Sequence, residues 1–118
     1  MSFSAKWAEV LEAKGLISPV EVPAPRLDCS EKEFQAAVVK LAKAKGWLVY
    51  RTSNSRGSEM GFPDLMAVRE RVVYAELKTK IGDTTPAQKV WIAAINSAQG
   101  ECYVWRPSDW PTIKELLK

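Results

Sequence analysis

Residues 61–78 read GFPDLMAVRERVVYAELK, and this stretch decides the fold. Two runs rich in apolar and β-branched residues, Leu65–Arg69 and Val72–Leu77, are separated only by Glu70 and Arg71. Such runs are typical of β-strands, and so short a separation leaves room only for a tight turn. The stretch therefore predicts an antiparallel hairpin.

The second strand of this hairpin has two different faces. Because side chains alternate along a strand, Tyr74, Glu76 and Lys78 share one face. The opposite face is apolar and consists of Val73, Ala75 and Leu77. One face is therefore suited to a core, and the other carries two charged groups side by side.

The register of the hairpin sets two carboxylates against each other. If the chain turns about Glu70, residues whose numbers sum to 140 pair, so that Asp64 lies opposite Glu76, and a two-residue turn shifts this by one place. Directly opposed Cβ atoms are roughly 4.5–5.5 Å apart. Two carboxylates that close repel each other and raise a pKa unless a cation lies between them. The pair therefore predicts a divalent metal site.

The chemistry of this site follows from its ligands. Carboxylate oxygens suit Mg²⁺ or Mn²⁺, which keep several waters and also hold a phosphate oxygen. Such an ion polarises the phosphate and lowers the pKa of a bound water. Lys78, on the same face, is placed to orient the attacking hydroxide or to neutralise the transition state. The constellation of Asp64, Glu76 and Lys78 predicts phosphodiester hydrolysis, whereas the alternative interpretation is a solvated cross-strand ion pair.

A helix precedes the hairpin and offers a third carboxylate. Ser30 and Glu33 form a capping-box pattern ahead of apolar residues at helical spacing, up to Gly46. At 100° per residue, the apolar stripe lies closer to Glu31 than to Glu33. We therefore expect Glu31 to point inward as a ligand, although an acidic first-turn residue also suits the helix dipole.

The remaining elements alternate between strands and helices. We expect a strand at 47–50, a polar loop at 52–61 and a strand at 102–105. Thr85, Pro86 and Gln88 predict the start of a helix that runs to Gly100. A last helix is expected at 110–117. The order predicts an α/β fold with a central mixed β-sheet flanked by helices.

The first 28 residues form a separate part. Residues 3–16 have an amphipathic helical pattern with Trp7, Val10 and Leu11 at i, i+3 and i+4. The prolines of residues 17–28 predict an extended connector. We therefore divide the chain into an N-terminal helix and connector at 1–28, for docking or dimerisation, and a main domain at 29–118.

Composition excludes several classes of protein. The chain has no histidine, which removes Ser-His-Asp and Cys-His mechanisms. Its two cysteines, Cys29 and Cys102, form no zinc or disulfide pattern, and residues 1–17 resemble no signal peptide. We expect a cytoplasmic protein without a membrane partner. A net charge of +3 permits a polyanionic partner but does not demonstrate one.

The motifs together resemble a known family. Glu31, the stretch Gly61–Asp64, the stretch Glu76–Lys78 and Gln88 are similar to the Glu, (G)xPD, ExK and Gln pattern of VRR-NUC domains, over about residues 29–110. These domains belong to the PD-(D/E)XK nucleases, which have a restriction-endonuclease-like core. The small stand-alone members are often phage-encoded.

This resemblance implies a Mg²⁺- or Mn²⁺-dependent deoxyribonuclease, frequently acting on flapped or branched DNA such as a Holliday junction. It implies that Asp64 and Glu76 are metal ligands, that the Leu77 carbonyl is an extra ligand and that Lys78 is the catalytic lysine. It makes Glu31 an accessory ligand. Gln88 remains a weaker site residue, because it completes a capping box with Thr85 in any case. Cleavage of a four-way junction would further require a symmetric homodimer.

Further residues are candidates for contacts with DNA phosphates, or are simply solvated. They are Arg51, Ser53, Ser55, Arg56 and Lys80. We expect Trp91 and Trp105 in the core and not on a base-stacking surface. The rival functions are a non-catalytic DNA-binding module of a phage replication or recombination complex, and a structural subunit that acts through its N-terminal helix.

Overall fold

The protein is described by a computed structural model at residues 10, 21–52, 57, 59–79 and 82–118. The predicted N-terminal helix lies almost wholly outside these described residues. The elements, in chain order, are α2 (Glu31–Ala44), β1 (Leu48–Arg51), β2 (Leu65–Val68), β3 (Val72–Leu77), α3 (Pro86–Ser97), β4 (Glu101–Trp105), the 3₁₀ turn η2 (Pro107–Asp109) and α4 (Trp110–Leu117). This order and the central mixed sheet confirm the predicted α/β architecture.

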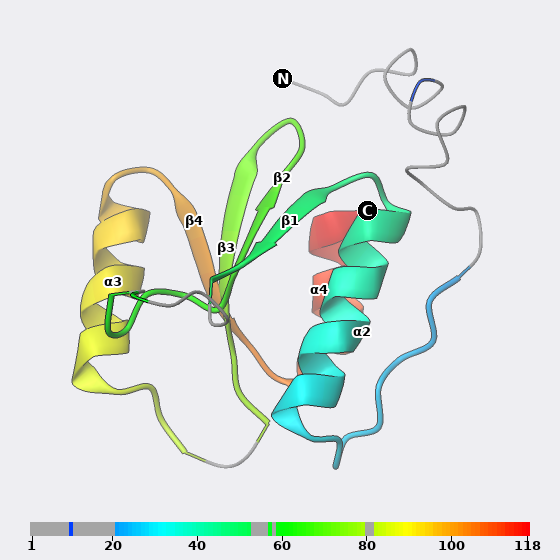
Figure 1. Cartoon of the computed structure of the whole chain (residues 1–118), viewed down its shortest axis with the longest axis horizontal. Helices are drawn as coiled ribbons and strands as arrows, with labels where there is room; N and C mark the ends of the chain where they lie inside the picture. The colour runs from blue at the N-terminus through cyan, green and yellow to red at the C-terminus, as the bar shows by residue number, and fades with distance from the viewer. Residues whose placement is uncertain (1–9, 11–20, 53–56, 58, 80–81) are drawn as a thin grey trace.

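The four strands form one sheet in the order β1-β2-β3-β4. The β1–β2 and β2–β3 pairs are antiparallel, and the β3–β4 pair is parallel. A parallel pair needs a crossover connection, and α3 provides it. In Figure 1, α3 lies beside β4 at one side of the sheet, whereas α2 and α4 lie together at the other.

The β2–β3 hairpin has the predicted register. Leu65 pairs with Ala75, and Val68 with Val72. The first strand ends at Val68 and not at the predicted Arg69. The backbone N–H of Arg69 donates to the carbonyl of Arg71 across 3.0 Å, so the turn contains three residues centred on Glu70.

The main core lies between the sheet and the helices α2 and α4. The apolar face of β3 enters it, since Val73, Ala75 and Leu77 are all buried. The α2 face that meets them is also buried at its apolar positions: Phe34, Val38, Val39, Leu41 and Ala42. Burial of the apolar faces of the two layers against each other is the main force that holds them together.

Part of the predicted connector belongs to this core. The Val22 side chain is buried in the same cluster as the helices. Glu21 beside it forms an ion pair with Lys114 of α4. The described part of the connector therefore packs against the domain and contains no helix or strand.

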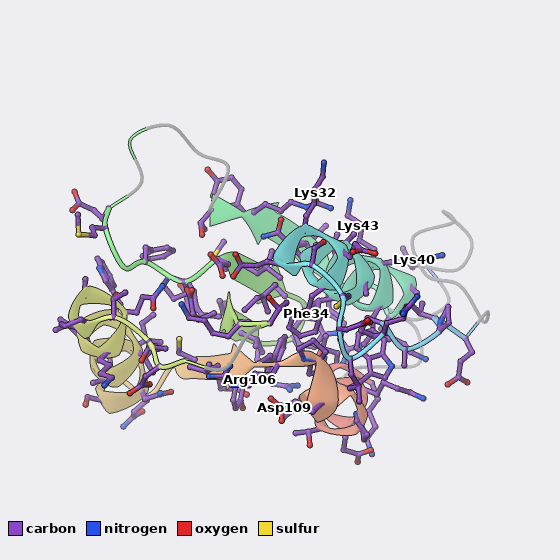
Figure 2. All side chains as sticks on the ribbon, turned by 90° about the horizontal axis from the view of Figure 1, so that it is seen from below. Lys32, Phe34, Lys40, Lys43, Arg106 and Asp109 are labelled. Carbon is purple, nitrogen blue, oxygen red and sulfur yellow. The ribbon has the colours of Figure 1, made fainter. Side chains whose placement is uncertain are left out.

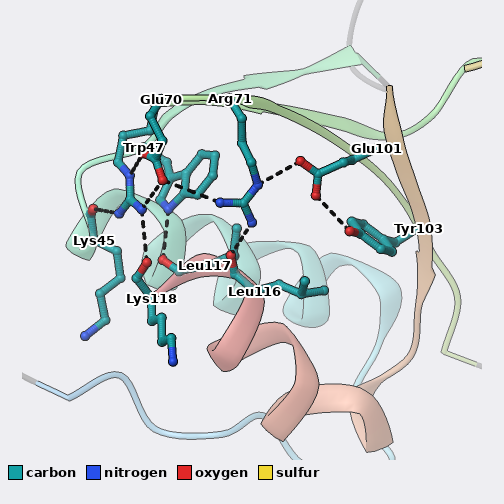
Figure 3. A network of polar contacts seen from close by, with 10 residues as sticks. Lys45, Trp47, Glu70, Arg71, Glu101, Tyr103, Leu116, Leu117 and Lys118 are labelled. Carbon is teal, nitrogen blue, oxygen red and sulfur yellow. Dashed lines mark hydrogen bonds and ion pairs between the residues drawn. The ribbon is translucent and has the colours of Figure 1, made fainter. Parts of the chain in front are cut away.

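The hairpin turn is bonded to the end of α4 (Figure 3). The indole N–H of Trp47 donates to the Leu117 carbonyl, and the Arg71 guanidinium donates to the Leu116 carbonyl. The Arg69 guanidinium lies 4.6 Å from the centroid of the Trp47 ring and also donates to the Lys118 carbonyl. Carbonyls at a helix C-terminus lack hydrogen-bond donors within the helix. The side chains of Trp47, Arg69 and Arg71 donate the missing hydrogen bonds. The network holds the outer end of the hairpin in place.

Gly61 brings the GFPD segment against the start of α3. Its φ is +87°, and a Cβ atom there would lie 2.5 Å from the backbone carbon of Ala87. Gly57 has a similar φ of +83°, with open space around the same position. A side chain at Gly57 would therefore meet backbone strain alone, whereas one at Gly61 would meet both strain and a steric clash.

We predict that Gly61→Ala destabilises the protein by roughly 2–3 kcal/mol, because strain and clash add. Gly57→Ala should lose only about 1 kcal/mol, from the left-handed conformation alone. Urea unfolding measures both variants. Equal losses would show that the close approach of Gly61 to α3 has no energetic consequence.

Candidate active site

The hairpin brings Asp64 and Glu76 together, as the register predicts. Asp64 directly precedes β2, and Glu76 lies on the polar face of β3. The Asp64 carboxylate accepts a hydrogen bond of 2.9 Å from the backbone N–H of Leu77. This bond turns the Asp64 side chain toward the end of β3, next to Glu76.

Glu76 is a buried carboxylate with an incomplete set of partners. It is only 3% exposed, and its Oε1 atom has no hydrogen-bond partner among the residues that the structure describes. Burial and then the negative charge of Asp64 raise the pKa of Glu76 from 4.5 to about 8. A buried carboxylate oxygen without a donor is unfavourable unless a cation or proton satisfies it.

Lys78 lies on the same face of the sheet. Its Nζ atom is 3.9 Å from Glu76 Oε2, and its side chain is 22% exposed. The Lys78 charge lowers the pKa of Glu76, although burial and Asp64 outweigh it. The ammonium group therefore borders the carboxylate pair without neutralising it.

Gln88 makes both a capping-box contact and a contact with Glu76. Its Oε1 accepts from the Thr85 backbone N–H at 2.8 Å, as in a capping box. Its Nε2 donates to Glu76 Oε2 at 2.9 Å. One side chain thus caps α3 and holds one oxygen of Glu76, which leaves Oε1 as the oxygen without a partner.

The two candidate carboxylates of α2 are clearly different. Glu33 accepts from the Ser30 backbone N–H at 3.0 Å and completes the capping box, as predicted. Glu31 is exposed, and its charge contributes to the raised pKa of Glu76. Glu31 therefore lies within electrostatic reach of the site, and its role as an accessory ligand stays a prediction.

Sequence reasoning missed Thr52, which holds the Pro63-Asp64 segment. Its hydroxyl donates to the Pro63 carbonyl, and its backbone N–H donates to the Asp64 carbonyl at 2.9 Å. The side chain is buried, so both bonds are shielded from water. A threonine at the end of a strand gives no distinctive signal, because its partners are eleven and twelve residues away.

An aromatic group next to the carboxylates was also missed. Phe62 packs edge-on against Trp91 of α3 at 4.9 Å and against Tyr74 of β3 at 6.0 Å. Trp105 is buried in the core as predicted, whereas Trp91 is only partly buried. Phe62 therefore links the GFPD segment to both α3 and the sheet.

The donor set can be tested against a divalent ion. No group of three or more His, Cys, Asp or Glu side chains that could hold a metal occurs among the described residues. Mg²⁺ and Mn²⁺ nevertheless bind through one or two carboxylates, with waters and substrate phosphates as further ligands. Asp64 and the free oxygen of Glu76 fit such an ion. The Leu77 carbonyl stays a predicted ligand.

The weaker phosphate-binding candidates are only partly described. Arg51 is exposed at the end of β1 and pairs in register with Leu65, the residue after Asp64. The other four candidates lie outside the described residues, and they are Ser53, Ser55, Arg56 and Lys80.

Comparison with known proteins adds no relative. No family model, no curated protein and no solved structure matches the chain. Among the described residues, no helix is both long and apolar enough to cross a membrane.

The raised pKa of Glu76 predicts an unusual dependence of stability on pH. A carboxyl group that binds its proton more tightly in the folded state stabilises the fold at low pH and loses this contribution as pH rises. In EDTA, we expect the thermal midpoint to fall between pH 4.5 and about 8 because of Glu76. Glu76→Gln should abolish the decline.

Mg²⁺ provides a second test of the same site. An ion that binds only the folded state raises the midpoint, and it should do so more at pH 8 than at pH 5, where protons compete for Glu76. Differential scanning calorimetry gives these midpoints. A decline that persists unchanged in Glu76→Gln would assign the effect to other groups.

Proposed function

We propose that the protein is a Mg²⁺- or Mn²⁺-dependent nuclease that hydrolyses phosphodiester bonds in DNA. The observation that carries this proposal is the buried Glu76 carboxylate beside Asp64, one oxygen of which has no partner in the described part of the chain. Lys78 within 3.9 Å supplies a cation on the same face. Paired carboxylates with an adjacent lysine suit phosphoryl chemistry better than other reactions that this chain can support without histidine.

In this mechanism the residues of the chain act mainly by position. Asp64 and Glu76 would hold the ion, which would supply Lewis-acid activation of the phosphate and of the attacking water. Gln88 fixes the orientation of Glu76, and the backbone of Leu77 fixes that of Asp64. Lys78 orients the water or neutralises charge that develops on the phosphate.

The finer assignments belong to the same proposal. The order helix, three strands, helix, strand supports a restriction-endonuclease-like core of the VRR-NUC type. The resemblance to this type further implies a flapped or branched DNA substrate and, for junctions, a homodimer. It also implies a cytoplasmic location in a bacterial or phage-infected cell.

We predict that labelled linear, nicked, flapped and four-way-junction DNAs are cut with Mg²⁺ or Mn²⁺ and remain intact in EDTA. Asp64→Asn and Lys78→Met should each lose at least about a hundredfold in rate, because each removes a group that acts on the transition state. Asp28→Asn, at an exposed ion pair with Arg26, is the matched control and should cut normally. Binding without cutting in every metal would instead indicate the non-catalytic DNA-binding module.

The assignment of the α2 carboxylate has its own test. Glu31→Gln should reduce the cleavage rate and raise the Mg²⁺ concentration needed for half-maximal rate, because a charge near Glu76 is removed. Glu33→Gln retains the capping box, since glutamine serves at this position, and should leave both quantities unchanged. The reverse result would identify Glu33 as the ligand.

A further inference from the structure

The outer side of α2 carries a row of lysines, which we name the α2 lysine row: Lys32, Lys40 and Lys43. At 3.6 residues per turn these positions fall within roughly 80° of the helix circumference and extend over about 16 Å. Ala36 also falls in this arc, so no acidic side chain interrupts the row. Figure 2 shows the three lysines along one side of α2, with Phe34 on the opposite side toward the sheet.

The charges of this row are not neutralised locally. All three lysines are exposed, and none forms an ion pair with another described residue. Four lysines elsewhere in the described part of the chain do pair with carboxylates, and they are Lys78, Lys89, Lys114 and Lys118. The adjoining acid on α2, Glu33, is held by Ser30 at the helix cap. The row therefore presents uncompensated positive charge, which attracts polyanions.

The row begins in the first turn of α2, which also carries Glu31. Lys32 follows Glu31, whose charge acts on Glu76. A further basic residue, Arg51 at the end of β1, pairs with Leu65, directly after Asp64. By alternation along β1, Arg51 shares the face of Val49, which packs against the core beneath α2. Arg51 and the row therefore both place positive charge on the α2 side of the sheet.

We propose that the α2 lysine row binds backbone phosphates of the DNA strand that leads away from the scissile bond. This inference rests on the proposed function for its substrate. Lysines contact phosphates as point charges, and phosphate contacts carry no sequence information, so the row positions DNA without sequence preference. Its length of about 16 Å allows each lysine to contact a different phosphate.

The test compares two triple variants with the same change in charge. The first is Lys32→Gln/Lys40→Gln/Lys43→Gln. The control is Lys45→Gln/Lys114→Gln/Lys118→Gln, whose lysines line a groove on another surface, beside Glu21 and Trp110. Affinity for labelled duplex and single-stranded DNA is measured in EDTA over a range of salt concentrations, so that binding is separated from cleavage.

We expect the first variant to bind about tenfold or more weakly, and the slope of log K against log salt to fall by about 2–3, near 0.9 for each lost phosphate contact. The control should change both quantities far less. Equal effects of the two variants would overturn the proposal in favour of a general effect of net charge, and normal binding by the first variant would show that its lysines are only solvated.

The outcome also separates this inference from the proposed nuclease function. If the wild type binds DNA through the row but cuts none with Mg²⁺ or Mn²⁺, the row stands and the catalytic proposal fails. If the wild type cuts DNA and the first variant keeps its affinity and salt slope, the nuclease stands and the row is rejected. Circular dichroism of both variants confirms that each is folded.

Discussion

The antiparallel register of β2 and β3 is the constraint on which the rest of the site depends. Leu65 opposite Ala75 places Asp64 beside Glu76 and puts Val73, Ala75 and Leu77 into the core. A shift of one residue would reverse every side chain between the two faces. Burial of the apolar face thus selects the register that brings the carboxylates together.

The two sides of the sheet are held by different forces. On one side, α2 and α4 bury apolar residues in a continuous core. On the other, α3 has no buried residue and is attached through Gln88, through the Phe62–Trp91 contact and through hydrogen bonds of Asn96 to the Cys102 backbone. The candidate active site lies on this second side, where polar bonds contribute more to the assembly.

The buried Glu76 carboxylate lowers the free energy of unfolding at neutral pH. A carboxylate at 3% exposure beside Asp64 destabilises the protein at neutral pH, and the nearby Lys78 does not compensate. Natural proteins retain such unfavourable groups mainly at functional positions. The Glu76 oxygen that lacks a partner among the described residues is therefore the observation behind the proposed metal site.

Local patterns in the sequence determined the elements, the hairpin register and the apolar face of β3, because each depends on residues close in the chain. The capping boxes at Ser30 and Thr85 belong to the same class. Tertiary structure alone decided the contacts made across the chain: Thr52 on Pro63, the free Glu76 oxygen, and Arg69 at the end of α4. Burial and long-range hydrogen bonds arise only when distant segments pack together, and no spacing in the sequence encodes them.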